Sequence, residues 1–183
     1  YTTLERTNIM VSNNGWGYPR DFDYGSSAAS FDASTRDALP DEPGMQEMLY
    51  VFAAGNSGSG NGIGRGGEPG SITAPATAKN VITVGAIDSP RLITNEVVYV
   101  VDGQLVTNQL FLPLTDSDDE VAPFSSRGNV GIGREGPRGR FKPDLVAPGT
   151  FIVSTRSGDF EVEIGATNIQ RNVFTDQAVE SRD

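Results

Sequence analysis

The 183-residue sequence contains neither cysteine nor histidine. Without cysteine, these residues can form no disulfide, no thiolate nucleophile and no cysteine zinc site. Without histidine, they offer no imidazole to accept the proton of a nucleophilic serine near neutral pH. The sequence therefore excludes a complete Ser-His-Asp triad built from these residues alone.

Long apolar runs and basic patches are also lacking. No apolar run approaches the about 20 residues that span a membrane, and the first residues do not read as a charged-then-apolar signal. The net charge of −10 and the pI of about 4.4 argue against nucleic acid or a membrane as a partner. The opening residues 1–6 carry neither an initiator Met nor a tag, so we expect a fragment or a product of cleavage.

Several short apolar runs, separated by loops rich in Gly and Pro, predict an α/β fold with one core. The only helical pattern covers residues 30–39, where Ser30 is the expected cap, Asp32 favours the first turn and Pro40 ends the helix. Strands are predicted at the apolar runs within residues 8–13, 49–58 and 80–86, with a further strand at residues 151–155.

The central stretch, residues 49–58, is an apolar run that stops at small residues and one amide. The lack of alternation predicts a strand covered on both faces, as in a parallel sheet. Asn56 then follows the carboxyl end of the strand, where open α/β sheets bind ligands. The carboxamide of Asn56 is thus a candidate donor, although these residues alone favour a turn cap in the loop 56–70.

Residues 8–13 repeat this arrangement, because an apolar run again leads into small residues around one distinctive side chain. Trp16 is the only tryptophan and lies between Gly15 and Gly17. Two interpretations are equally favoured: the ring anchors the loop to the core, or it forms the wall of a pocket.

Residues 90–120 do not follow this pattern of an apolar run that leads into small residues, and they predict an inserted β-hairpin. Two β-rich segments, residues 96–101 and 104–112, flank Asp102-Gly103, which suits the two positive-φ positions of a type I′ turn. The exit of the insertion, residues 116–120, holds four carboxylates. A solvated acidic loop is the favoured interpretation of this exit, ahead of a calcium site.

Four motifs follow one another along the chain. They are Ala53-Ala54-Gly55-Asn56-Ser57; Ile72-Thr73-Ala74-Pro75-Ala76 with Asn80-Val81-Ile82-Thr83-Val84-Gly85-Ala86; Phe124-Ser125-Ser126-Arg127-Gly128; and Lys142-Pro143-Asp144-Leu145-Val146-Ala147-Pro148-Gly149. These motifs occur in the order and approximate spacing of the subtilisin-like serine peptidases, and the chain resembles that family from about residue 8 to about residue 156. A fifth segment, Asn14-Gly15-Trp16-Gly17, is similar to the family's Asn-Ser-Trp-Gly, with Gly15 in the place of Ser.

The resemblance implies a role for each matched segment. Asn56 resembles the oxyanion-hole asparagine, and Thr73, Ala74 and Pro75 resemble the floor of the substrate pocket, where the bond before the proline is often cis. Calcium is common in the family and compatible with so acidic a chain, but no metal ligand can be named from these residues. The walls of the pocket would be formed by Gly15, Trp16, Gly17, Ala53, Ala54 and Gly55.

The family's Asp and His motifs and its Gly-Thr-Ser-Met-Ala nucleophile motif do not occur in this sequence. We therefore expect residues 1–183 to be a partial subtilisin-like peptidase domain, inactive alone, from a secreted endopeptidase whose triad lies elsewhere. The partial fold that the resemblance implies holds a mainly parallel sheet of about four strands, at residues 9–13, 48–54, 81–86 and 145–146. The alternative is a non-catalytic peptide-binding or structural module of the same descent. The expected partners are a peptide or protein substrate and the rest of the catalytic domain. A partly uncovered sheet face leads us to expect self-association of the fragment as well.

Overall fold

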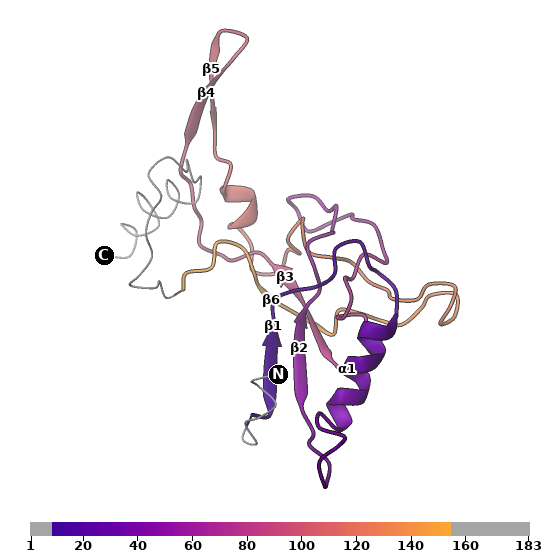
Figure 1. Ribbon diagram of the computed structural model, residues 1–183. Coiled ribbons are helices and arrows are strands. Elements are labelled where there is room, and N and C mark those ends of the chain that lie inside the picture. Colours follow the sequence, from indigo (N-terminus) through magenta and orange to yellow (C-terminus); the bar gives the residue numbers. More distant parts are fainter. Residues whose placement is uncertain (1–8, 155–183) are drawn as a thin grey trace.

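A four-stranded parallel sheet forms the centre of the computed structural model, which describes residues 9–154 (Figure 1). The spatial order is β1-β2-β3-β6, and all three pairings are parallel. The expected α/β fold with about four parallel strands is therefore confirmed, with strand ends shifted by one or two residues. The strands are β1 Val11–Asn14, β2 Leu49–Ala53, β3 Ile82–Ile87 and β6 Leu145–Pro148.

The further strand expected at residues 151–155 is wrong for residues 151–154, which have no strand structure; residue 155 lies outside the described residues. Phe151 has a φ of 45°, in the left-handed region that extended chains do not adopt, so the extended run stops after β6. The Phe151 ring instead meets Phe111 edge-to-face, with ring centroids 5.4 Å apart. This contact ties the residues after β6 to the insertion.

Helix α1, Ser26–Arg36, begins before the expected start at Ser30 and ends before Pro40. Its N-cap is Gly25, and no side chain caps its first turn. Ser30 is therefore not the cap, and Asp32 lies in the body of the helix rather than in its first turn. The physical reason is packing, because the earlier start brings the fully buried Ala28 into the core.

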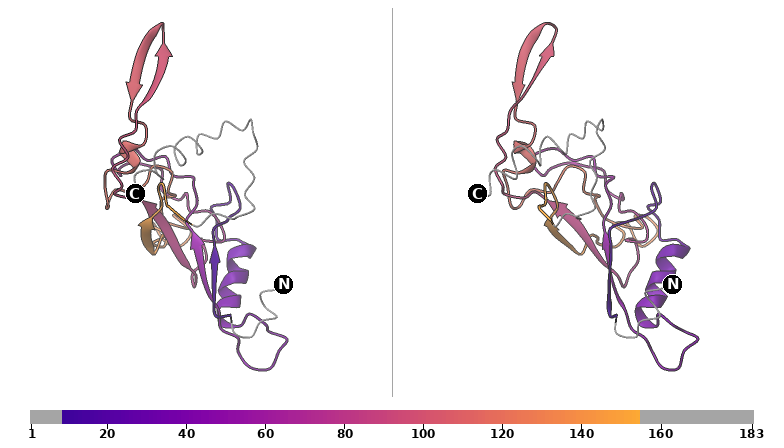
Figure 2. Two further views of the ribbon diagram at one scale, coloured as in Figure 1. Left: turned by 90° about the vertical axis from the view of Figure 1, so that its left-hand side faces the viewer. Right: turned by 60° about the vertical axis from the view of Figure 1, so that its left-hand side comes forward.

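The core lies between α1 and one face of the sheet, as Figure 2 shows from two directions. Phe31 of α1 meets Phe52 and Tyr50 of β2 edge-to-face, with centroids 4.8 and 4.9 Å apart. Along β2 these buried residues alternate with the more exposed Leu49 and Ala53. The expectation of a strand covered on both faces is thus wrong within residues 9–154, because α1 packs on one face only.

Within residues 90–120 the chain forms the antiparallel hairpin β4, Val97–Val101, and β5, Gln104–Asn108, which projects from the sheet (Figure 1). Asp102 and Gly103 have φ values of 50° and 77°, as a type I′ turn requires, so the predicted hairpin is confirmed. The second strand ends at Asn108, earlier than the expected residue 112. The 3₁₀-helix η1, Leu112–Leu114, follows.

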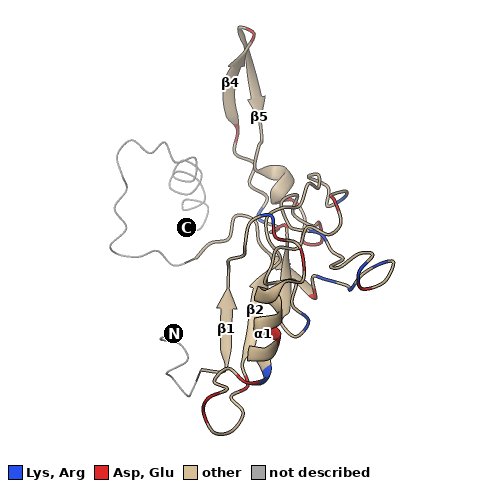
Figure 3. Ribbon diagram, turned by 45° about the vertical axis from the view of Figure 1, so that its right-hand side comes forward, with Lys and Arg blue, Asp and Glu red and all other residues tan. Residues whose placement is uncertain are grey.

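Charged residues gather in the loops, whereas the strands of the sheet are almost free of them (Figure 3). The described residues include no helix that is long and apolar enough to cross a membrane. The charged side chains of the fold therefore lie in its loops and on α1 rather than in the sheet.

Candidate functional site

A cleft of about 230 Å³ opens where β1 and β2 end. One wall comes from the segment after β1 and the other from the segment after β2, because parallel strands deliver their following loops to the same edge of a sheet. Most of the residues predicted for a substrate pocket meet here. The lining residues are Gly15, Trp16, Gly17, Pro19, Ala53, Gly55, Asn56, Ser57 and Thr73.

A second cleft of about 260 Å³ adjoins the first across the carboxyl ends of β2, β3 and β6. Ala54, which does not line the first cleft, lines this one. Asn56 lines both clefts, so this residue lies at the junction between them.

The backbone around Gly55 is held from two sides. Thr73 N donates to Ala54 O at 2.9 Å, and Ser126 N donates to Gly55 O at 3.0 Å. Gly55 has a φ of 107°, and a Cβ at this position would clash with Thr73 Oγ1. Only glycine suits both the conformation and the close approach, and these contacts hold the backbone next to Asn56, which lines the cleft.

The carboxamide of Asn56 is exposed and forms no hydrogen bond with any of residues 9–154. A turn-capping asparagine would use this group to bond the backbone of its own loop. The geometry thus gives no support to the turn cap, and the amide donors remain free to bind a molecule in the cleft.

Trp16 combines both interpretations that its sequence context left open. Its Nε1 donates to Asn14 Oδ1 at 3.2 Å, and its ring meets Phe52 edge-to-face at 5.5 Å. The side chain is nevertheless 45% exposed and lines the first cleft. Core packing therefore fixes the ring in place while one side of it forms a wall.

Ala74 and Pro75 do not line either cleft, because both are fully buried behind Thr73. The Ala74-Pro75 peptide bond is cis, as the resemblance led us to expect. Tyr18 N donates to Ala74 O, and Ala74 N donates to Asp21 O, both at 2.8 Å. These hydrogen bonds join residue 74 to the segment after β1, and Thr73 is the one of these three residues that lines a cleft.

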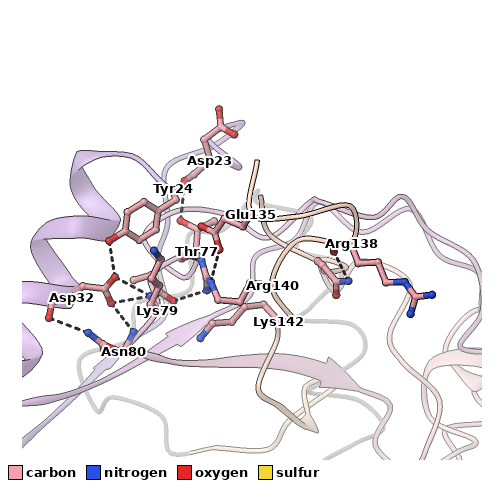
Figure 4. A network of polar contacts seen from close by, with 12 residues as sticks. Asp23, Tyr24, Asp32, Thr77, Lys79, Asn80, Glu135, Arg138, Arg140 and Lys142 are labelled. Atoms are coloured by element: carbon pink, nitrogen blue, oxygen red, sulfur yellow. Dashed lines mark hydrogen bonds and ion pairs between the residues drawn. The ribbon is translucent and has the colours of Figure 1, made fainter. Parts of the chain in front are cut away.

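A polar network that the sequence did not reveal holds the floor segment against α1 (Figure 4). The buried Asp32 carboxylate accepts hydrogen bonds from Lys79 N at 2.8 Å, Asn80 N at 2.6 Å and the Tyr24 hydroxyl at 2.8 Å. The hydrogen bond to Asp32 raises the pKa of Tyr24, because it stabilises the protonated phenol. Asp32 is thus a positioning residue for the turn that leads into β3.

Two basic residues complete this support. Arg140 donates to Thr77 O at 2.7 Å and Ala78 O at 3.2 Å, within the same network (Figure 4). Lys142 Nζ donates to Val81 O at 2.7 Å and pairs with Asp144. Burial lowers the pKa of Lys142, although Asp144 partly offsets this effect. The loop before β6 is therefore tied to the floor segment and to the start of β3.

A separate group of carboxylates lies just beyond the carboxyl end of β3. Asp88, Asp116 and Glu120 each offer an oxygen within 4.8 Å of the other two. Burial, together with the nearby Glu120 and Asp116, raises the pKa of Asp88 from 3.8 to about 6. The expected solvated acidic loop describes Asp116, Asp118 and Asp119, which are exposed, whereas Glu120 is partly buried near Asp88.

Comparison with known proteins agrees with this geometry. The model of the Subtilase family matches residues 1–178. Serine protease AprX of Bacillus subtilis (strain 168) is 31% identical over 136 residues, which cover 73% of this chain. The chain spans 23% of the length of that relative. Because the family match extends over nearly the whole sequence, the chain belongs to the subtilase family.

Proposed function

We propose that this chain is a segment of a subtilisin-like serine endopeptidase, in which it supplies the oxyanion hole and the walls of the substrate cleft. Membership of a serine peptidase family supports the reaction class. The observation that carries the assignment is the exposed carboxamide of Asn56, without a hydrogen bond to residues 9–154, at the junction of two clefts.

In this proposal a serine outside the chain attacks the carbonyl carbon of a peptide bond. A bond forms between the serine oxygen and that carbon, and the carbonyl oxygen becomes an oxyanion. Asn56 Nδ2 donates a hydrogen bond to the oxyanion, which stabilises the transition state more than the ground state. The proton of the serine passes to a base that also lies outside the chain, because these residues include no histidine.

The walls of the cleft hold the substrate in an extended conformation. The segments 15–17 and 53–55 offer backbone groups on either side of the cleft, so a peptide can pair with them as an added strand. Trp16 and Thr73 then contact the side chain that precedes the scissile bond. The isolated chain does not hydrolyse peptides, because it binds and polarises the carbonyl group without a nucleophile or a base.

The proposal is tested by Asn56→Ala in the protein that carries this chain together with a triad, assayed with a chromogenic peptide. Removing such a donor in subtilisin, itself a subtilase, lowers kcat by about 10²–10³, and we expect a loss of that size here with little change in KM. The matched control is Asn108→Ala, an exposed amide on the hairpin, which should leave kcat unchanged. An unaltered kcat in Asn56→Ala would refute the role of Asn56.

A serine-directed fluorophosphonate distinguishes an endopeptidase from the alternative, a non-catalytic peptide-binding module. An endopeptidase is labelled and loses its turnover, whereas a protein that binds peptides without labelling or turnover is the module. Serine-dependent turnover by the purified 183-residue chain would contradict the proposed inactivity of the chain alone. A secreted location is part of the proposal by family resemblance, and fractionation of cells and medium tests it.

A further inference from the structure

The exit of the insertion returns to the body of the protein beside the end of β3. Ile87 and Val121 form an antiparallel bridge, and Asp88 N donates to Glu120 O at 2.8 Å. These backbone contacts bring Asp88, the first residue after β3, against the acidic residues 116–120. Asp88 and residues 116–120, which are far apart in the sequence, therefore lie side by side at the base of the hairpin.

The carboxylate of Asp88 is buried there without a positively charged partner among residues 9–154. Its side chain is 1% exposed, and its Oδ1 has no hydrogen-bond partner. Asp116 and Glu120 direct carboxylate oxygens to within 4.8 Å of it. Among residues 9–154, no Lys or Arg forms an ion pair with any of the three. Burying an unpaired carboxylate beside two others is costly, so this arrangement lacks a positive charge.

We propose that Asp88, Asp116 and Glu120 bind a calcium ion at the base of the insertion. Calcium takes oxygen ligands at about 2.3–2.6 Å, so two oxygens on opposite sides of one ion lie about 5 Å apart. The separations of up to 4.8 Å between the three carboxylate oxygens fit one such ion. Further backbone oxygens or water molecules complete the six to eight ligands that calcium prefers.

The ligand chemistry separates calcium from other metals. Zinc favours nitrogen and sulfur ligands, and the chain contains no histidine or cysteine. Magnesium demands a small, nearly ideal octahedron, whereas three carboxylates on two irregular segments suit the flexible coordination of calcium. The bound ion would join the end of β3 to the insertion and so stabilise the base of the hairpin without taking part in peptide hydrolysis.

The test is calcium binding by the full chain, measured by titration calorimetry after treatment with a chelator. We expect one ion per chain and a higher Tm in calcium, with weaker binding of magnesium. Asp88→Asn and Glu120→Gln should each weaken calcium binding by about tenfold or more. The matched control is Asp118→Asn, an exposed carboxylate of the same loop, which should bind calcium as the parent chain does.

Three outcomes would overturn the site: no calcium binding by the parent chain at millimolar calcium, unchanged affinity in both variants, or equal loss in Asp118→Asn. Tighter binding of magnesium would overturn the choice of metal. Glu120 is only partly buried, so Glu120→Gln keeps the test decisive even if Asp88→Asn fails to fold. Circular dichroism of each variant without metal identifies such a failure.

Discussion

Strands β2 and β4 are built from similar residues but lie in opposite environments. Both are short runs of aliphatic and aromatic residues, yet Phe52 of β2 is fully buried whereas Val100 of β4 is 66% exposed. β2 has a parallel neighbour on each side and is covered by α1, while β4 has one antiparallel partner. Apolar composition thus specifies a strand, and long-range neighbours decide whether it becomes core.

The two regions also differ in how their strands meet. The hairpin pairs residues that are adjacent in sequence, joined by a two-residue turn, so local chemistry sets its register. The sheet pairs segments separated by long loops, and its register depends on tertiary contacts such as Phe31 against Phe52. Changes to the sheet should therefore affect the whole fold, whereas changes to the hairpin should remain local.

The largest expected effect is that of Phe52→Ala, which removes the fully buried ring between α1 and Trp16. The free energy of unfolding should fall by about 3–5 kcal/mol, because burial is lost and a cavity remains. Leu105→Ala in the hairpin, where the side chain is 76% exposed, should change it by less than about 0.5 kcal/mol. Urea denaturation of the full chain measures both, and equal losses would show that the hairpin belongs to the same core.

A smaller difference is expected between two glycines with positive φ. Gly55→Ala should lower the free energy of unfolding by about 3 kcal/mol, because strain adds to a clash with Thr73. Gly103→Ala, in the hairpin turn, meets open space and should cost only about 1 kcal/mol from its backbone conformation. Thermal unfolding compares the two variants, and similar Tm values would refute the tight packing around Gly55.

The smallest of the three effects concerns the junction of sheet and insertion, in the chain freed of metal by a chelator. The pKa of Asp88 is about 6 in the folded chain and 3.8 in its ordinary state, so the folded state binds more protons between these values. The contribution of Asp88 to stability is therefore fully present below about pH 4 and is lost as the pH rises through about 6. Tm measured from pH 4 to pH 7 follows this loss.

Asp88→Asn should remove this part of the pH dependence, because an amide does not titrate. Asp118→Asn, in the exposed part of the same loop, should retain it. A pH profile unchanged by Asp88→Asn would show that the raised pKa of Asp88 has no effect on stability.

The elements with strong local patterns were predictable from the sequence. Strands β1, β2 and β3 follow from their apolar runs, and the hairpin follows from Asp102-Gly103, whereas β6 was expected only through the family resemblance. The start of α1 was not predictable in this way. Ser30 offers a better cap than Gly25, but the burial of Ala28 extends the helix to residues before Ser30. The absent strand at residues 151–154 likewise depends on the left-handed Phe151, which no local pattern signals.

The candidate site likewise contains residues that the sequence predicted and residues that it did not. Gly15–Gly17 and Asn56 belong to contiguous motifs, and the structure brings them to one cleft, although their proposed roles remain to be measured. Asp32 and Asp88 were missed as parts of larger groups, because their partners lie far along the chain and no spacing marks them. An acidic residue within an apolar helix face or directly after a buried strand is the signal that could have drawn attention to them.

The pairing of β3 with β6 requires the chain to close a loop of residues 88–144, of which the insertion makes up about half. The entropy lost on closing a flexible loop grows only with the logarithm of its length, so doubling a loop costs about 0.6 kcal/mol. A fold that already joins these strands through a long excursion can therefore accept an added hairpin at little thermodynamic penalty. This point of the sheet is accordingly a place where new recognition elements can be added while the register of the parallel strands is kept.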